Sequence, residues 1–210
     1  MCLLRYKIFS TRIQMSNIQK KIPFMASVFG NLVFQMFVVY RAIDATINNA
    51  NLKDFATRNR FLLGISSIGI TMALAFAKSL NVPIKFVLFT ILSVITGMLA
   101  HNITDLKEAL LEAVAIFIAM VFAGIVTVQL GYDLSTLGIF LFFSLIALIF
   151  ARLLSPSKQK YTKIATLIFA LYVVYDTNNI LQRNYGGDFV DATLDYFIDI
   201  VNLMRLSNEE

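Results

Sequence analysis

Two aspartates, Asp176 and Asp199, lie inside apolar runs near the C-terminal end of the sequence, in IFALYVVYDTNNI and LDYFIDIVNL. A carboxylate at membrane depth costs a few kcal/mol or more, so such residues face a partner or a water-filled cavity. If the two segments pack together, the carboxyl groups can approach each other. Two close carboxylates in a medium of low dielectric constant do not readily ionise together. We therefore expect the pair to share one proton and to respond to pH without a histidine.

The same pair also predicts a cation site. Deprotonated carboxylates are hard oxygen ligands of the kind that calcium prefers. Asp195 lies one helical turn before Asp199, and Asn202 and Asn178 lie close to the two aspartates in the chain, so all three are candidates to line a cation path. We predict Asp176, Asp199 and Asp195 as cation ligands, with Ca²⁺ as a permeant or bound ion and no tightly bound cofactor.

Two more charged residues lie in apolar segments. Glu112 is either an acid at the membrane interface or part of the same cavity. Lys78 is either an amine that reaches the headgroups or a latch cation for the aspartates. With one His and one Cys, the sequence has no zinc-type ligand cluster, and it has no glycine-rich phosphate loop. These residues predict no enzyme.

Composition identifies the class of protein. The 210 residues are 58% hydrophobic and 15% charged, whereas soluble domains are about 45–50% apolar and about 25% charged. The chain is therefore predicted to be a multi-pass membrane protein. Its basic residues flank the apolar segments, which favours contact with phospholipid headgroups in the bilayer and no nucleic acid.

Seven apolar segments follow a basic leader at 1–22. They cover 24–43, 61–80, 84–102, 109–130, 136–154, 161–181 and 189–206. Most approach the ~20 residues that cross a bilayer as a helix. We predict an all-α, seven-transmembrane-helix bundle over 23–207, with the polar stretch NNANLKDFATRNR as its longest loop. The leader favours a cytoplasmic N-terminus, although the Lys and Arg counts on the two sides do not decide the orientation.

The seventh segment is the most acidic. Asp191, Asp195 and Asp199 follow one another at i, i+4 and i+8 and share one face of a helix. Such a helix cannot be surrounded by lipid. We expect it either to lie at the centre of the bundle or to enter the membrane and return, with Asp191 at a helix N-terminus that favours negative charge.

Several stretches resemble motifs of the Bax inhibitor family of membrane proteins, in order along nearly the whole chain. They are VFGNLVFQMF, LLEAVAIF, QLGYDLSTLG, YVVYDTNNI and LDYFIDIVNL. The last two are the most specific, and together the stretches are hard to match by chance.

The resemblance implies a seven-helix bundle with a central last helix, and a pH-sensitive calcium leak that increases on acidification. It places the family's paired aspartates on Asp176 and Asp199 and its glutamate on Glu112. Some members have an arginine latch; no arginine aligns here, and Lys78, the nearest cation, lacks the bidentate fork of arginine. The resemblance also implies suppression of cell death, with apoptosis-related membrane proteins as partners. The expected location is the ER or Golgi in a eukaryotic or viral setting and the plasma membrane in a bacterial one.

Two alternatives to the leak channel stay open. One is a non-conducting membrane regulator of apoptosis that acts through protein partners. The other is an intramembrane aspartyl protease, which also places two aspartates on adjacent membrane helices. Tyr175-Asp176 fits one protease motif, but Gly186-Gly187-Asp188 lacks the spacing of the other, so the protease is the weaker alternative.

Overall fold

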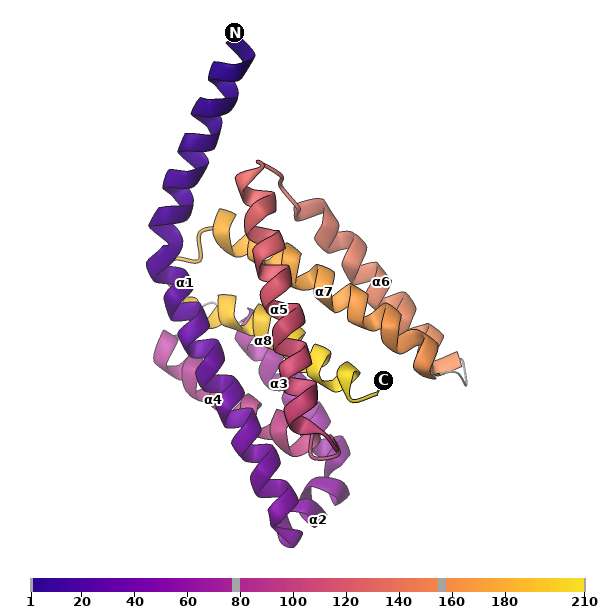
Figure 1. The fold of residues 1–210 in the computed structure, drawn as a ribbon. Coiled ribbons are helices and arrows are strands. Elements are labelled where there is room, and N and C mark those ends of the chain that lie inside the picture. Colours follow the sequence, from indigo (N-terminus) through magenta and orange to yellow (C-terminus); the bar gives the residue numbers. More distant parts are fainter. Residues whose placement is uncertain (1, 77–79, 155–157, 210) are drawn as a thin grey trace. The chain divides into compact units, whose positions relative to one another are not determined.

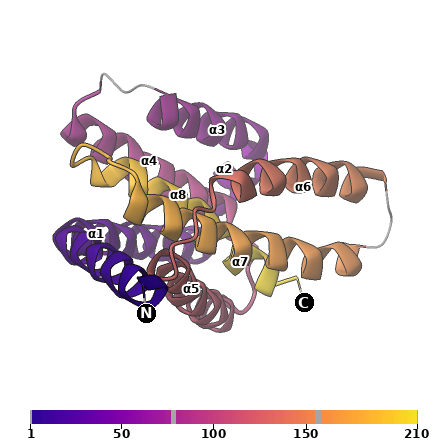
Figure 2. The same ribbon diagram turned by 90° about the horizontal axis from the view of Figure 1, so that it is seen from above.

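The computed structural model describes residues 2–76, 80–154 and 158–209, and Figures 1 and 2 show its helices in two views. These residues form helices and short connections, with no strand among them. The predicted all-α class is therefore confirmed. The helices are α1 (Cys2–Asn48), α2 (Ala50–Arg58), α3 (Arg60–Phe76), α4 (Val82–Leu99), α5 (Leu106–Gln129), α6 (Ser135–Leu154), α7 (Lys158–Gln182) and α8 (Phe189–Ser207).

The chain divides into two compact units. Unit 1 comprises Met1–Met25, Asp105–Tyr185 and Ile198–Glu210, and unit 2 comprises Ala26–Thr104 and Gly186–Phe197. In unit 1, α7 packs against both α5 and α6, and Figures 1 and 2 show α6 and α7 side by side. In unit 2, α3 packs against α4. Helices α1 and α8 each contribute residues to both units.

Five stretches are long and apolar enough to cross a membrane. They are Gln19–Asn48, Val82–Leu99, Leu106–Gln129, Ser135–Arg152 and Tyr161–Gln182. Helices α2 and α3 pass the same test only as a pair, which is bent by 75°. Helix α8 does not pass, because its acidic residues make it too polar. Among the described residues the count is therefore five or six, and the predicted seven spans are not confirmed.

One continuous helix, α1, covers both the predicted leader and the first apolar segment. Helix α1 begins at Cys2 and continues through Pro23 to Asn48. No glycine or proline interrupts the first 22 residues, so nothing in this stretch ends the helix. The cytoplasmic location of the leader stays a prediction.

The predicted polar loop contains a helix instead. Ala50–Arg58 forms α2, and its N-terminus is capped by Asn49. The Asn49 side-chain oxygen accepts hydrogen bonds from the backbone N–H groups of Asn51 (3.0 Å) and Leu52 (3.3 Å). Polar composition suggested a loop, but Asn49, the residue directly after α1, caps the next helix, because asparagine is a strong N-cap.

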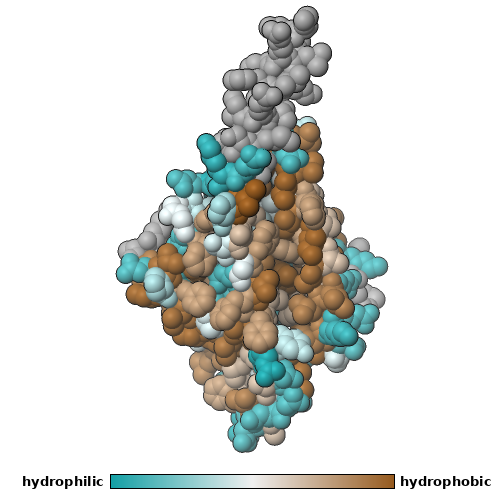
Figure 3. All heavy atoms as spheres, turned by 60° about the vertical axis from the view of Figure 1, so that its left-hand side comes forward, coloured by the Kyte–Doolittle hydropathy of each residue, from teal (hydrophilic) through white to brown (hydrophobic). Residues whose placement is uncertain are grey.

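Large apolar side chains point outward from several helices. Phe61 of α3 is 79% exposed and Phe140 of α6 is 76% exposed. Figure 3 shows apolar residues over much of the visible face. Such surface is unfavourable in water but suits contact with lipid chains. Together with the five apolar stretches, it indicates a multi-pass membrane protein.

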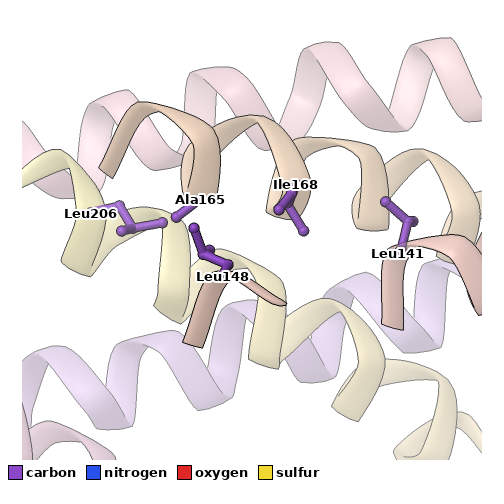
Figure 4. Packing of buried hydrophobic residues seen from close by; sticks show 5 residues of the cluster. All are labelled: Leu141, Leu148, Ala165, Ile168 and Leu206. Carbon is purple, nitrogen blue, oxygen red and sulfur yellow. The ribbon is translucent and has the colours of Figure 1, made fainter. Parts of the chain in front are cut away.

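A small apolar cluster packs the end of α8 in unit 1. It consists of Leu141 and Leu148 of α6, Ala165 and Ile168 of α7, and Leu206 of α8. Figure 4 shows the side chains of Leu148, Ala165 and Leu206 converging. The cluster places the C-terminal end of α8, the helix that carries Asp199, against α6 and α7.

Candidate functional site

In α7, the two neighbours of Asp176, Tyr175 and Thr177, pack closely against glycines of α6 and α5. A Cβ atom at Gly124 of α5 would lie 2.8 Å from Thr177 Cγ2, and one at Gly138 of α6 would lie 2.5 Å from the Tyr175 hydroxyl oxygen. Real side chains do not pack so closely, so both positions require glycine for this close approach of helices. The two contacts flank Asp176 and fix the rotation of α7 about it.

Replacing Gly124 by alanine is expected to destabilise unit 1 by about 2 kcal/mol, because the added methyl group overpacks the α5–α7 contact. Thermal unfolding in detergent measures the loss. Gly64→Ala is the matched control, since a Cβ atom at Gly64 of α3 meets nothing within 4 Å. Equal unfolding temperatures for the two variants would contradict the packing argument.

Asp176 and Asp199 are brought into one buried region of unit 1. Asp176 is 8% exposed and Asp199 is 3% exposed. Both carboxyl groups interact electrostatically with the phenol of Tyr172, which lies one helical turn before Asp176 in α7. The two residues with the strongest sequence signal therefore lie near a common third group.

Such a region can hold and exchange a proton. Two carboxyl groups in one buried region favour a shared proton over two charges. The Tyr172 hydroxyl is a neutral donor and acceptor that can hydrogen-bond to a carboxyl group in either protonation state. Sequence analysis missed Tyr172, although its i, i+4 spacing from Asp176 places both residues on one face of the helix.

Asn178, a predicted lining residue, is hydrogen-bonded at both ends of its carboxamide. Its Nδ2 donates to Thr127 Oγ1 and to the Tyr132 carbonyl oxygen, each at 2.9 Å. Its Oδ1 accepts from the Leu134 backbone N–H at 3.2 Å and from Gln182 Nε2 at 3.0 Å. These contacts connect α7 to the turn between α5 and α6, so Asn178 has a structural role.

The other predicted lining residues are less buried. Glu112 is exposed on α5, whereas Asp195 and Asn202 are half-buried on α8. Asn202 Nδ2 donates to the Ile198 carbonyl oxygen of its own helix at 2.7 Å. Lys78 lies outside the described residues. Within the described part of the chain, no three His, Cys, Asp or Glu side chains gather as possible metal ligands. The assignment of Asp176, Asp199 and Asp195 as cation ligands stays a prediction.

Unit 2 contains a buried lysine that sequence analysis missed. Lys85 of α4 is 1% exposed. Its Nζ donates to Asp188 Oδ2 at 2.6 Å and to Asp191 Oδ1 at 2.8 Å. The signal in the sequence was a single lysine within the apolar run VPIKFVLFTIL, where a charge needs a partner.

Gln35 forms a second polar contact in unit 2. It is fully buried, accepts a hydrogen bond from Ser93 Oγ at 2.8 Å and donates to Thr90 Oγ1 at 3.4 Å. Both partners lie on α4, so the network joins α1 to α4, as is common between membrane helices. Gln35 also donates to Asn31 Oδ1 at 3.3 Å within α1.

Comparison with known proteins places the chain in a family. The family model described as "Inhibitor of apoptosis-promoting Bax1" matches residues 21–206. Protein LIFEGUARD 4 of Arabidopsis thaliana is 34% identical over 152 residues, which are 69% of this chain and 53% of the plant protein. This chain also covers 55% of Protein LIFEGUARD 2, so it spans about half the length of these plant relatives.

Two further relatives carry informative names. Bax inhibitor 1 of Schizosaccharomyces pombe is 28% identical over 71% of this chain and 58% of its own length. The Golgi anti-apoptotic protein of Vaccinia virus (strain Lister) is 22% identical over 93% of this chain and 87% of its own length. Because the family model matches nearly the whole chain, from the first membrane helix to the end of α8, the chain belongs to the Bax inhibitor family.

Proposed function

We propose that this protein is a pH-sensitive calcium leak channel, gated by a proton-sharing pair formed by Asp176 and Asp199. The observation that carries the proposal is the burial of both aspartates in one unit, where both interact with Tyr172. A buried carboxylate in a membrane protein is costly and therefore marks an ion or proton path.

The pair would gate the leak by changing how α7 and α8 pack. With one proton shared, the two carboxyl groups attract each other and hold the helices together. Loss of that proton leaves two like charges in a region of low dielectric constant, and gain of a second removes the shared charge. Either change would favour an alternative packing of the two helices, which is how a local charge change is converted into movement.

The proposed channel has seven membrane helices. We count the bent pair α2 and α3 as one span and α8 as the seventh, central helix. The burial of Tyr196, Phe197 and Leu203, each at most 2% exposed, supports a position for α8 away from lipid. The first 22 residues are assigned to the cytoplasmic side.

The cellular role proposed for the channel is calcium homeostasis in an endomembrane and suppression of cell death. The relative named a Golgi anti-apoptotic protein supports both the location and the role. Calcium release from such a compartment is a physical route by which a leak could influence cell death, with apoptosis-related membrane proteins as partners.

Calcium flux into dye-loaded liposomes that contain the purified protein tests the proposal. The wild-type protein is expected to pass calcium at a rate that varies with pH, and Asp176→Asn/Asp199→Asn is expected to lose that variation. Asp54→Asn is the matched control, because Asp54 is exposed and its contact with Arg58 contributes little. Unchanged flux and pH dependence in the double variant would overturn the gating pair.

A second function, a non-conducting regulator of apoptosis, is favoured by the names of the relatives, which mention Bax inhibition and anti-apoptotic action but no transport. The same liposomes separate the two functions. Flux no greater than in empty liposomes at every pH would support the regulator and contradict the channel.

A further inference from the structure

We infer that Lys85 is a positioning residue that anchors the first turn of α8 through Asp188 and Asp191, and that this anchor restrains the leak. The claim that this contact restrains the leak rests on the proposed channel function. The claim that Lys85 holds the first turn of α8 is independent of it. The group of three residues is called the Lys85 anchor below, and all three belong to unit 2.

Lys85 forms ion pairs with both aspartates of the Lys85 anchor. The Lys85 side chain is 2% exposed, and its ammonium nitrogen lies 2.6 Å from Asp188 Oδ2 and 2.8 Å from Asp191 Oδ1. The aspartate side chains are 18% and 31% exposed. A buried ammonium group without partners would be strongly unfavourable, so the position of Lys85 depends on these two carboxylates.

Asp188 connects the lysine to the backbone of α8. While Oδ2 accepts from Lys85, Oδ1 accepts from the backbone N–H groups of Val190 at 3.1 Å and Asp191 at 3.3 Å. The carboxylate thus caps the helix N-terminus and binds the lysine at the same time. Any movement of the first turn of α8 must therefore disturb the ion pair.

Two glycines with positive φ angles precede the first turn of α8. Gly186 and Gly187 have positive φ angles of 60° and 84°, and a Cβ atom at either would meet nothing within 4 Å. Glycine is the residue that tolerates this conformation, and it brings no side chain that could anchor the connection. The Lys85 anchor adds side-chain contacts directly after these two glycines.

Uncharged contacts hold the rest of this half of α8 within unit 2. Thr193 Oγ1 donates to the Val28 carbonyl oxygen at 3.3 Å, and the rings of Phe89 and Phe197 meet edge to face at 4.9 Å. Loss of the ion pair should therefore free the first turn of α8 without unfolding unit 2. Asp199 follows Asp191 by eight residues in the same helix. A movement of the first turn of α8 can therefore change the position of Asp199.

Three variants test the anchor. Lys85→Met leaves two carboxylates that face each other without a cation, and it is expected to lower the unfolding temperature in detergent by roughly 10 °C. Lys85→Met/Asp188→Asn/Asp191→Asn removes all three charges and is expected to recover at least about half of that loss, because no uncompensated charge remains. Asp54→Asn serves again as the exposed control.

A cysteine at position 189 reports on the first turn of α8. In a Cys2→Ser background, Phe189→Cys is expected to react several-fold faster with a soluble maleimide when Lys85→Met is added. Wild-type stability and an unchanged labelling rate in Lys85→Met would overturn the anchor. A labelling increase without recovery of stability in the triple variant would also overturn it, because the loss would then come from side-chain packing.

Calcium flux decides the regulatory half of the inference. Lys85→Met is expected to raise the leak roughly tenfold at constant pH. If the wild-type protein conducts and Lys85→Met conducts equally, control of the leak by the anchor is overturned. If the wild-type protein passes no calcium, the proposed function fails, and unfolding temperature and labelling alone then decide the anchor.

Discussion

Asp199→Asn alone is expected to remove the pH transition of the proposed calcium leak. The reason is that proton sharing needs two carboxyl groups: an asparagine leaves Asp176 with no second carboxylate to repel or to share a proton with. Asp176→Asn is expected to have the same effect, because the transition belongs to the pair. The measurement is the initial rate of calcium uptake by liposomes at a series of pH values.

Non-additivity separates this account from two independent sites. If the aspartates act as a pair, the double variant has the same flat pH profile as either single variant. If each aspartate titrated separately, each single variant would keep part of the transition and only the double variant would lose all of it. That second pattern would contradict the pair.

Asn178→Leu is expected to lower the free energy of unfolding by about 3 kcal/mol. The substitution removes all four hydrogen bonds of the carboxamide and leaves the Leu134 N–H without the Asn178 oxygen as its acceptor. A buried polar group that loses its partner costs about 1–3 kcal/mol. Denaturant unfolding in mixed micelles measures the change.

Gln182→Leu is the control for Asn178. Gln182 also donates to the Tyr132 carbonyl oxygen, at 2.9 Å, but it is exposed, so water can replace its side chain. Its loss is expected to be below about 1 kcal/mol. Equal losses for the two variants would show that the buried carboxamide has no special role in connecting α7 to the α5–α6 turn.

The sequence predicted the all-α class and the apolar helices well. Long runs such as FLFFSLIALIF have a single physical interpretation, because an outward apolar surface of this extent suits lipid. Asp176 and Asp199 stood out for the complementary reason, since an acid within such a run needs a specific environment. Both turned out to be buried, and the family predicted from the motifs was confirmed.

Other features depend on contacts that a linear pattern does not contain. Lys85 could have faced headgroups near the start of its helix, and only the positions of Asp188 and Asp191 make it a buried ion pair. Asn178 was a candidate to line a cation path, and its hydrogen bonds to a turn some 45 residues earlier in the chain are not visible in the linear sequence. The helix at Ala50–Arg58 was not predicted, because a polar amphipathic helix and a polar loop have similar amino-acid compositions.

The most direct test of the central claim is infrared difference spectroscopy of the reconstituted protein as pH is changed across the range of the flux transition. The account predicts that the wild-type protein gains or loses a carboxylic acid signal at the pH where its calcium leak changes, and that Asp199→Asn and Asp176→Asn each lose this signal. A flux transition in the wild-type protein with no carboxyl titration at the same pH, or an undiminished signal in both variants, would contradict a proton-sharing pair as the gate.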